Sequence, residues 1–253
     1  MSLTRDRVGE ILESLLPPLV VEELRESGGL PCHRYQNATI AQSDLVGFTA
    51  LASTRQPQEV VEFIRDLFGI FDDIADKYGI YKIETVGDAY IAGQAERPLT
   101  QENKPLEVVR FALEITQATQ AWSSRKGQSV NCRVGIHTGP CIGGIVGISM
   151  QRYHLFGSLL SCLEGLESTS EAGKVQISKA CHELAKKELL LHASEYMSEE
   201  DRSLFEFEMR TTNELKTSKG DVVDFEAVGG YPTYFAHYSG NHVNLRTPVH
   251  AKM

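Results

Sequence analysis

The sequence predicts an α/β (α+β) fold built on a ferredoxin-like β-α-β-β-α-β sheet, with extra strands towards the C-terminus. Segments with strand and helix patterns alternate in this order between Tyr35 and Val146. The two inner strands lie close enough in the chain to form a hairpin. The chain has 253 residues, of which 42% are hydrophobic, and this is enough for one substantial core.

The first half of the pattern is a buried strand, a long amphipathic helix and a hairpin. Asn37 to Asp44 is predicted to be the strand. Apolar residues then recur at helical spacing until Gly79 supplies a stop: Val60, Ile64, Leu67, Phe68, Phe71, Ile74 and Tyr78. The predicted hairpin joins Tyr81 to Thr85 with Ala89 to Gly93 through a turn that contains Gly87.

The second half repeats a helix and then strands. Pro105 opens a predicted helix that carries Val108, Ala112, Ile115 and Trp122 on one face. Around Thr138-Gly139-Pro140 we expect two separate strands, Val130 to His137 and Cys141 to Val146. The remaining predicted elements are a helix at Ser158 to Ser168, a strand at Lys174 to Ser178, and late strands at Phe205 to Met209 and Thr233 to Tyr238.

The folded domain is predicted to span residues 31–240, between a helical linker at residues 1–30 and a flexible tail at residues 241–253. From Thr4 to Gly28 the pattern is helical, with Val8, Ile11 and Leu15 on one face, until Pro17-Pro18 interrupts it. This segment is either the stump of a longer helix from an upstream sensor domain or an amphipathic helix docked on its own domain. The sequence leaves both alternatives open.

Composition excludes several classes of function. The net charge of −9 makes non-specific nucleic-acid binding a poor candidate. No apolar run approaches the roughly 18 residues of a membrane-spanning helix, and no signal peptide is visible. The five cysteines follow no metal-ligand spacing, as is typical of reduced thiols. We therefore expect a cytoplasmic domain, and the sequence leaves open whether the whole protein is attached to a membrane.

Two aspartates are predicted to converge at one edge of the sheet. Asp44 ends the first predicted strand and Asp88 starts the third, and these strands are antiparallel neighbours in a sheet of this order. Paired carboxylates suit two hard cations when the substrate supplies phosphate oxygens. The segment from Leu45 to Thr49 then leads into a helix, and its backbone N–H groups suit a polyphosphate. A single aspartate here would be explained as a cap or a solvated group, but the combination predicts a metal–phosphate site.

Four motifs in this order resemble the class III adenylate and guanylate cyclase catalytic domains: SDLVGFT (Ser43 to Thr49), YKIETVGDAY (Tyr81 to Tyr90), CRVGIHTGP (Cys132 to Pro140) and RYHLFG (Arg152 to Gly157). The resemblance runs from about Tyr35 to Lys187, with a fainter match at Thr233 to Phe235. It implies a signalling enzyme with two Mg²⁺ or Mn²⁺ ions. The reaction would be attack of a ribose 3′-hydroxyl on the α-phosphate, with release of pyrophosphate, at a site between two cyclase domains.

The resemblance also implies roles for individual residues. Asp44 and Asp88, with the carbonyl of Leu45, match the metal ligands, and Arg133 matches an arginine that contacts the triphosphate. The loop residues Val46, Gly47, Phe48 and Thr49 lie where the phosphates are bound.

Two further positions match those that read the base. Glu84 stands where guanylate cyclases have Glu and adenylate cyclases have Lys, so GTP is the expected substrate. His154 departs from the family, which has Cys for guanine or Asp for adenine at this position. A lysine near the C-terminal strands contacts phosphate in the family, and Lys216 and Lys219 are the candidates for this role, with solvated surface lysines as the alternative.

The helix after RYHLFG lacks a pair that the family uses. Ser161 and Gly165 stand where the family has an Asn that orients the ribose and an Arg that stabilises the transferring phosphate. The combination resembles the α subunit of heterodimeric soluble guanylate cyclase. It predicts a heterodimer whose partner supplies Asn and Arg, and a nearly inactive homodimer. The alternatives are a non-catalytic pseudo-cyclase that regulates a partner, and an adenylate cyclase, which Glu84 disfavours.

Overall fold

The structure is a computed structural model that describes residues 15–27, 32–147, 151–210, 214–217, 219–227 and 230–239. The predicted helical positions Val8 and Ile11 and the predicted tail at residues 241–253 lie outside the described residues.

The predicted β-α-β-β-α-β order is confirmed. It consists of β1 (Cys32–Val46), α4 (Pro57–Lys77), β2 (Tyr81–Val86), β3 (Ala89–Gln94), α5 (Pro105–Lys126) and β4 (Asn131–Val146), with the short α3 (Phe48–Ala52) after β1. The chain continues through β5 (Arg152–Phe156), α6 (Ser158–Ser168), β6 (Val175–Ile177), α7 (Lys179–Leu191), a 3₁₀ turn (Ala193–Glu195), α8 (Glu199–Leu204), β7 (Phe205–Met209), β8 (Glu214–Lys216), β9 (Val222–Asp224) and β10 (Tyr234–Tyr238).

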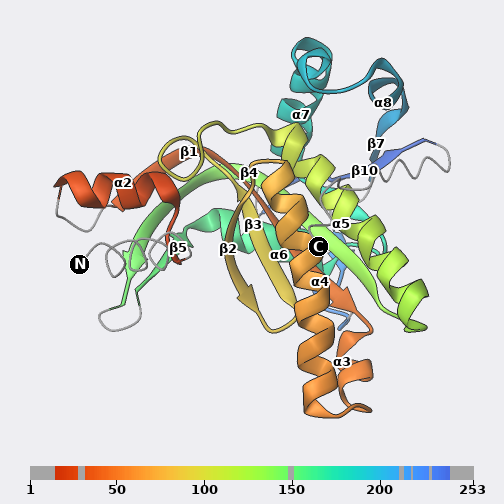
Figure 1. Cartoon of the computed structure of the whole chain (residues 1–253). Helices are drawn as coiled ribbons and strands as arrows, with labels where there is room; N and C mark the ends of the chain where they lie inside the picture. Colours follow the sequence, from red (N-terminus) through yellow and green to blue (C-terminus); the bar gives the residue numbers. More distant parts are fainter. Residues whose placement is uncertain are drawn as a thin grey trace, which may run out of the picture.

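The strands form one large sheet and one small one. The large sheet has the order β2-β3-β1-β4-β6-β10-β7, with β5 paired to the far half of β4. Its neighbours are antiparallel except for the parallel pair β4 and β6. Figure 1 shows this sheet as a curved layer behind α4 and α5. The strands beyond β4 confirm the predicted C-terminal extension, and β8 and β9 form a separate two-stranded sheet.

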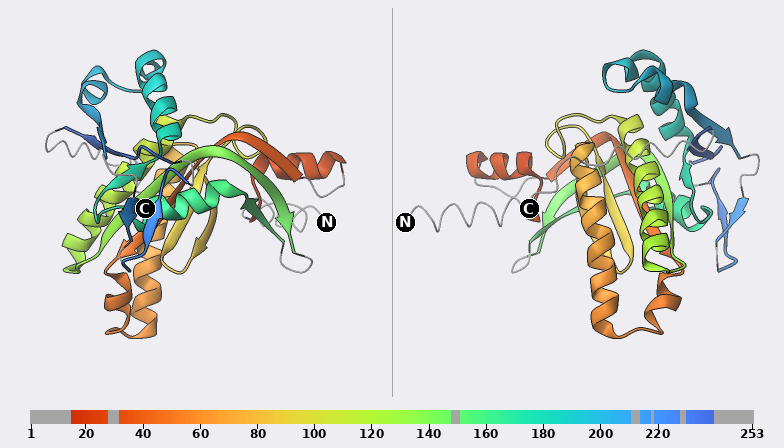
Figure 2. Two further views of the ribbon diagram at one scale, coloured as in Figure 1. Left: turned by 180° about the vertical axis from the view of Figure 1, so that it is seen from behind. Right: turned by 45° about the vertical axis from the view of Figure 1, so that its right-hand side comes forward.

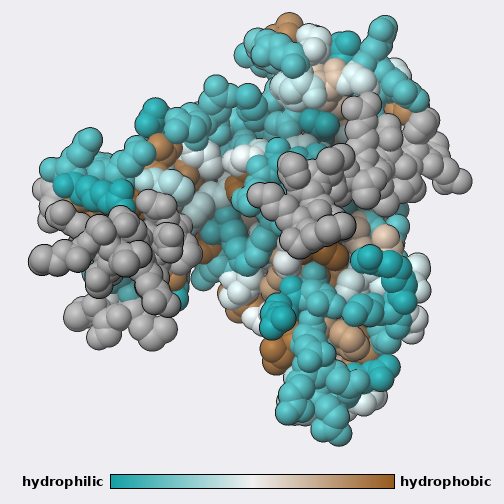
Figure 3. Space-filling model, in the orientation of Figure 1, coloured by the Kyte–Doolittle hydropathy of each residue, from teal (hydrophilic) through white to brown (hydrophobic). Residues whose placement is uncertain are grey.

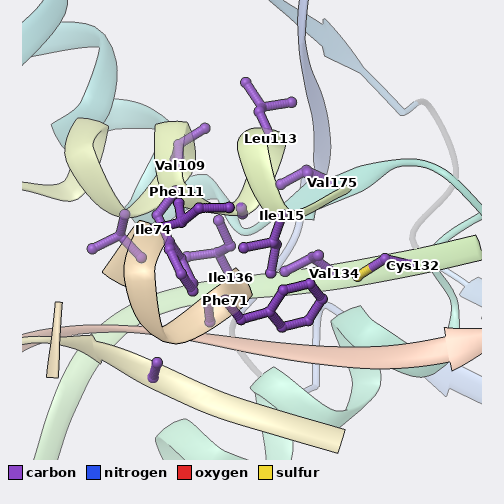
Figure 4. Close-up of a cluster of buried hydrophobic side chains, with 14 of the residues drawn as sticks. Phe71, Ile74, Val109, Phe111, Leu113, Ile115, Cys132, Val134, Ile136 and Val175 are labelled. Atoms are coloured by element: carbon purple, nitrogen blue, oxygen red, sulfur yellow. The ribbon is translucent and has the colours of Figure 1, made fainter. Parts of the chain in front are cut away.

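Helices cover both faces of the large sheet. On one face, α4 and α5 pack on β1, β3, β4 and β6, and the close-up in Figure 4 shows Phe71 and Ile74 of α4 beside Val134 and Ile136 of β4. The other face carries α6 (Figure 2). Leu159 of this helix joins a second cluster of buried residues. The two helices of the β-α-β-β-α-β unit therefore share one face of the sheet, and the later helix α6 covers the other.

The structure corrects the expected break near Pro140. β4 is a single strand of 16 residues, and it stays paired with β1 on both sides of this proline. The pairing register shifts by one residue between Tyr35 and Ala38, opposite Pro140. Proline lacks a backbone N–H, and a β-bulge removes the ladder bond that this N–H would make. β1 is also longer than expected, because it starts at Cys32 and ends at Val46, two residues beyond Asp44.

The N-terminal helix α2 spans Pro18–Ser27, and Pro17 precedes it as the expected interruption. Leu16, Val20 and Val21 are buried in the second cluster, next to the start of β1. Glu23 of α2 also pairs with His33 of β1 at 2.7 Å. α2 is therefore docked on its own domain, and the linker role expected for residues 1–30 stays a prediction.

The outer shape places α2 and α3 far apart. A space-filling view shows the molecule hollowed between the part that carries α2 and the part that carries α3 and α4, with hydrophobic residues along the hollow (Figure 3). Among the residues that the structure describes, no helix is both long and apolar enough to cross a bilayer.

Candidate active site

Asp44 projects from β1 towards the face of the sheet that α6 covers. Side chains alternate between the two faces of a strand. Ile40 lies in the cluster with α6, whereas Ala41 and Leu45 lie in the core under α4 and α5. Asp44 is therefore on the same side as Ile40, with about a quarter of its side chain exposed. Leu45, whose carbonyl is the expected backbone ligand, has a fully buried side chain.

Asp88 lies in the two-residue turn between β2 and β3, one residue before β3 begins. β3 runs antiparallel to β1, and Ser43 pairs with Tyr90, so this turn lies beside the end of β1. The charge of Asp88 is one of the causes that raise the pKa of Asp44. The structure thus brings the two predicted carboxylates together, and a metal role for them stays a prediction.

Arg133 lies between two carboxylates. It faces Asp44 across the β1–β4 ladder, and its Nη2 is 3.0 Å from Asp44 Oδ2. Its Nε donates to Glu167 Oε1 of α6 at 2.7 Å. The other oxygen of Glu167 accepts from Gln42 Nε2 at 3.4 Å. The arginine that was expected to contact phosphate is thus held by side chains of β1 and α6.

Sequence reasoning missed Glu167 and Gln42. Gln42 could have been predicted from the sequence. It is two positions before Asp44 on the same strand, so the two side chains must lie on the same face of the sheet. Glu167 depends on a close approach of α6 to β4. A Cβ atom on Gly135 would lie 2.3 Å from the backbone nitrogen of Glu167, so only glycine lets the helix reach this position.

The site has more negative than positive charge. Burial raises the pKa of Asp44, Asp88 raises it further, and Arg133 acts in the opposite direction. Burial likewise raises the pKa of Glu167, which Arg133 also opposes. The guanidinium of Arg133 is therefore paired with two carboxylates, and the charge of a third, Asp88, acts on Asp44. A bound cation would relieve this imbalance.

The donor set fits divalent ions that are shared with a substrate. Asp44 and Asp88 supply hard carboxylate oxygens, which Mg²⁺ and Mn²⁺ prefer. Across the described part of the chain, no cluster of three or more His, Cys, Asp or Glu side chains is arranged to hold a metal ion. The protein alone therefore offers an incomplete shell, as is typical of Mg²⁺ sites in which phosphate oxygens complete the coordination.

The loop after Asp44 has the shape that the phosphate prediction requires. Gly47 has φ +90° and caps α3, and a Cβ on it would lie 2.6 Å from the carbonyl oxygen of Ser129. Phe48 is buried and anchors the loop, whereas Thr49 is exposed. Because α3 has five residues, phosphate binding here would depend on local backbone N–H groups more than on a helix dipole.

The two expected base-reading residues also meet. His154 Nδ1 of β5 is 3.6 Å from Glu84 Oε2 of β2, and both side chains are more than one third exposed.

The two positions at which the family carries Asn and Arg differ from each other in exposure. Ser161 is exposed on α6, whereas Gly165 is buried against the small β8–β9 sheet. Lys216 and Lys219 are exposed on this same small sheet and its turn.

Comparison with known proteins gives a family. The sequence pattern described as the adenylate and guanylate cyclase catalytic domain matches residues 30–229. The chain is 36% identical over 176 residues to human guanylyl cyclase C, covering 69% of this chain and 16% of the relative. It is 37% identical over 174 residues to the receptor-type guanylate cyclase Gyc76C of Drosophila melanogaster, covering 68% of this chain and 11% of the relative. The chain therefore spans only a small part of the curated relatives that it matches.

Solved structures agree with the fold. The guanylate cyclase domain of RhGC from Catenaria anguillulae in complex with GTP has a TM-score of 0.64 and 25% identity, covering 81% of this chain and 98% of that chain. The catalytic core of a rhodopsin-guanylyl cyclase with converted specificity, in complex with ATPαS, has the same TM-score and identity. It covers 82% of this chain and 98% of that chain.

Proposed function

Because this chain belongs to the adenylate and guanylate cyclase catalytic domain family, we propose that it is the metal-binding subunit of a guanylate cyclase that converts GTP into cyclic GMP and pyrophosphate. The observation that carries the proposal is the convergence of Asp44, Asp88 and Arg133 at one end of β1. The proposal places the domain in the cytoplasm, where an upstream sensor acts on it through the N-terminal segment.

In this reaction the ribose 3′-oxygen forms a bond to the α-phosphorus. The bond between the α-phosphorus and the oxygen that bridges it to the β-phosphate breaks. Pyrophosphate leaves with the electron pair, and the 3′-hydroxyl proton is lost. Two divalent ions, when bound by Asp44, Asp88 and the Leu45 carbonyl, would lower the pKa of the hydroxyl and offset phosphate charge. The reaction needs positioning and electrostatic stabilisation but no side-chain nucleophile.

Arg133 would exchange one partner when the substrate binds. Its Nη2 is paired with Asp44, while its Nε is held separately by Glu167. A phosphate oxygen can take the place of Asp44 on Nη2, since arginine binds both groups through the same fork of donors. Glu167 would keep the guanidinium in place during this exchange.

The second half of a working site would come from another cyclase domain. Ser161 and Gly165 lack the reach of the Asn and Arg that the family carries at these positions. Loss of one such donor costs on the order of hundreds-fold in rate. A homodimer of this chain would therefore be very weak. Glu84 and His154 would lie in the other site, together with Ser161 and Gly165, so the partner would read the base at the working site. The choice of guanine therefore rests on the kinship with guanylyl cyclases.

One observation favours a second candidate, a non-catalytic pseudo-cyclase. The ion pair between Arg133 and Asp44 neutralises a proposed metal ligand. If this pair persists with nucleotide present, the chain would bind a partner or a nucleotide without turnover. The two candidates differ in whether the aspartates of this chain support catalysis.

A complementation assay separates them. The chain is mixed with a cyclase domain that keeps its Asn and Arg but has both metal aspartates replaced by Asn, so that any working site must use Asp44 and Asp88. We expect cyclic GMP from GTP with Mn²⁺ or Mg²⁺ in the mixture, little product from either protein alone, and less cyclic AMP from ATP. No product in a mixture that forms a dimer would favour the pseudo-cyclase. A normal rate from this chain alone would contradict the heterodimer.

A further inference from the structure

A small hairpin of the chain covers the part of α6 where the expected arginine is missing. β8 and β9 pair with each other and not with the large sheet, with Leu215 opposite Val223. Seen from behind, the hairpin lies against α6 (Figure 2, left). Leu215, Val223 and Phe225 pack on Cys162 and Leu166 of α6 in a cluster separate from the two larger ones.

The contact is closest at Gly165. A Cβ atom on this residue would lie 3.0 Å from Val223 Cγ1 and 3.6 Å from Phe225 Cε1. Even one added carbon would press on the hairpin, and an arginine side chain has no room. Ser161, one turn earlier on α6, is exposed. The covered region is therefore local to Gly165 and its neighbours.

The hairpin is an excursion from the large sheet. The backbone N–H of Arg210 donates to the Thr233 carbonyl at 2.9 Å, and Tyr234 pairs with Met209. The chain therefore leaves β7 and returns to β10 at the same point. Phe225 is fully buried, and the N–H groups of Gly230 and Tyr231 both donate to its carbonyl. The inner side of the excursion is thus anchored, while Lys216 and Val222 face outwards.

We propose that the β8–β9 hairpin is an internal plug that fills the α6 half-site of this chain and keeps a side chain or a second domain from using it. This inference rests on the proposed function, in which α6 faces the metal aspartates of the partner. It predicts a one-sided dimer. The suitable partner is a cyclase domain that brings its own Asn and Arg to Asp44 and Asp88, and whose own aspartates find no arginine on this chain.

Cysteine labelling measures whether the plug is closed. Cys162 lies beneath the hairpin, Cys132 and Cys181 lie in the core under α4 and α5, and Cys32 is exposed. With a thiol reagent and the chain alone, we expect Cys32 to react at once and the four buried cysteines, including Cys141 in the second core cluster, to stay protected. If wild-type Cys162 reacts as fast as Cys32, the hairpin does not cover α6 and the proposal is wrong.

Arginine at position 165 tests whether the hairpin takes its space. We expect Gly165→Arg to lift the hairpin and label Cys162 about tenfold faster or more, as for a local opening, with Cys132 and Cys181 still protected. Ser161→Arg, on the exposed turn of the same helix, is the matched control and should change nothing. A folded Gly165→Arg protein with Cys162 still protected would overturn the proposal.

If Gly165→Arg fails to fold, two smaller substitutions test whether the hairpin packs on Gly165. Gly165→Ala and Val223→Ala are measured by urea unfolding, singly and together. The alanine methyl at position 165 is strained only while Val223 Cγ1 is present, so we expect non-additivity of about tenfold in the unfolding equilibrium constant. Additive effects would overturn the plug. Both tests use the chain without nucleotide or partner, so their failure is distinct from failure of the cyclase assay.

Discussion

At the scale of single residues, the site is governed by a shortage of positive charge. Arg133 is shared between Asp44 and Glu167, and Asp88 adds a third carboxylate nearby. Burial and the nearby charge of Asp88 raise the pKa of Asp44 although Arg133 opposes them, so an added cation at this carboxylate would be stabilising. This is the kind of perturbation that gathers at functional sites more often than elsewhere.

The first prediction concerns the two aspartates. We expect Asp44→Ala or Asp88→Ala to lower the activity of the complemented dimer by on the order of a hundredfold or more, since each removes a proposed metal ligand. Stability should change by less than about 1 kcal/mol, because neither residue belongs to the hydrophobic core. Cyclic GMP assays and urea unfolding measure the two effects, with the exposed Asp73→Ala as the control. Full activity with Mg²⁺ after either change would remove the metal role.

The second prediction concerns His137, which is buried on β4. Burial lowers its pKa to about 4, and its Nδ1 lies 2.8 Å from Ser178 Oγ. A lowered histidine pKa means that the unfolded chain takes up the proton first. The associated stability is therefore present above pH 6.5 and is lost as the pH falls towards 4.

Between pH 7 and pH 5 this group should lower the free energy of unfolding by about 2 kcal/mol. Urea unfolding of the wild type and His137→Gln at both pH values isolates its contribution, because all other groups are shared. The variant should lose less stability than the wild type on acidification. Equal pH dependence in the two proteins would show that His137 is not held neutral by the fold.

At the scale of secondary-structure elements, periodicity predicted most of the fold. α4 and α5 follow from apolar spacing, and β7 matches its predicted bounds. The features that the sequence did not predict depend on contacts between residues far apart in the chain. From the local sequence, Pro140 predicts the end of a strand. In the structure, a β-bulge in β1 lies opposite this proline, so β4 continues through it. Likewise, nothing local shows that Gly135 opens the sheet to Glu167, or that β8 and β9 fold onto α6.

Part of the candidate site could also be predicted from the sequence. Asp44, Asp88 and Arg133 were predicted to share one region, and the structure brings them together. The carboxylate that holds Arg133 was not predicted, because α6 carries both Glu164 and Glu167, and only packing decides which one turns inwards.

The third prediction concerns the docking of α2. Val20 is fully buried against β1 and the second core cluster, so Val20→Ala should lower the free energy of unfolding by about 1–2 kcal/mol through lost burial and a small cavity. The exposed Glu22→Ala on the same helix should change it by less than about 0.5 kcal/mol. Urea unfolding compares the two. Equal, small effects would mean that α2 is not docked in solution, and would favour the linker alternative.

At the scale of the whole molecule, the two proposed halves of the site differ. One end of β1 carries carboxylates and an arginine, whereas the proposed half-site on α6 has Ser161 and Gly165 and is covered at Gly165 by the β8–β9 hairpin. The two features agree with each other. A chain that never offers an arginine to a partner can fill that space with Phe225 and Val223 and bury apolar area there.

The last prediction is that restoring the missing pair requires removal of the plug. Ser161→Asn with Gly165→Arg alone should leave the homodimer near background, because the hairpin that this arginine displaces stays tethered beside α6 at Arg210 and Thr233 and still obstructs the half-site. Replacing residues 211–232 by a short turn that keeps one lysine should be tolerated by the fold, since Arg210 and Thr233 already meet. The lysine stands in for Lys216 or Lys219, the candidates for the phosphate contact. In that background the same two substitutions should raise cyclic GMP production on the order of a hundredfold. Excision without them is the control and should stay inactive.

Three results would each contradict a different step of this prediction. High activity of the double variant with its hairpin in place would show that the hairpin does not block α6. A preference for cyclic AMP in the repaired protein would contradict the inference from Glu84, which would then lie in a working site beside His154. Inactivity of the repaired and excised protein, if it dimerises and binds Mn²⁺ and GTP, would assign the fault either to His154 or to the removal of Lys216 and Lys219, and a His154→Cys variant separates the two. This variant, with the residue that the family uses for guanine, should recover the rate if His154 is at fault.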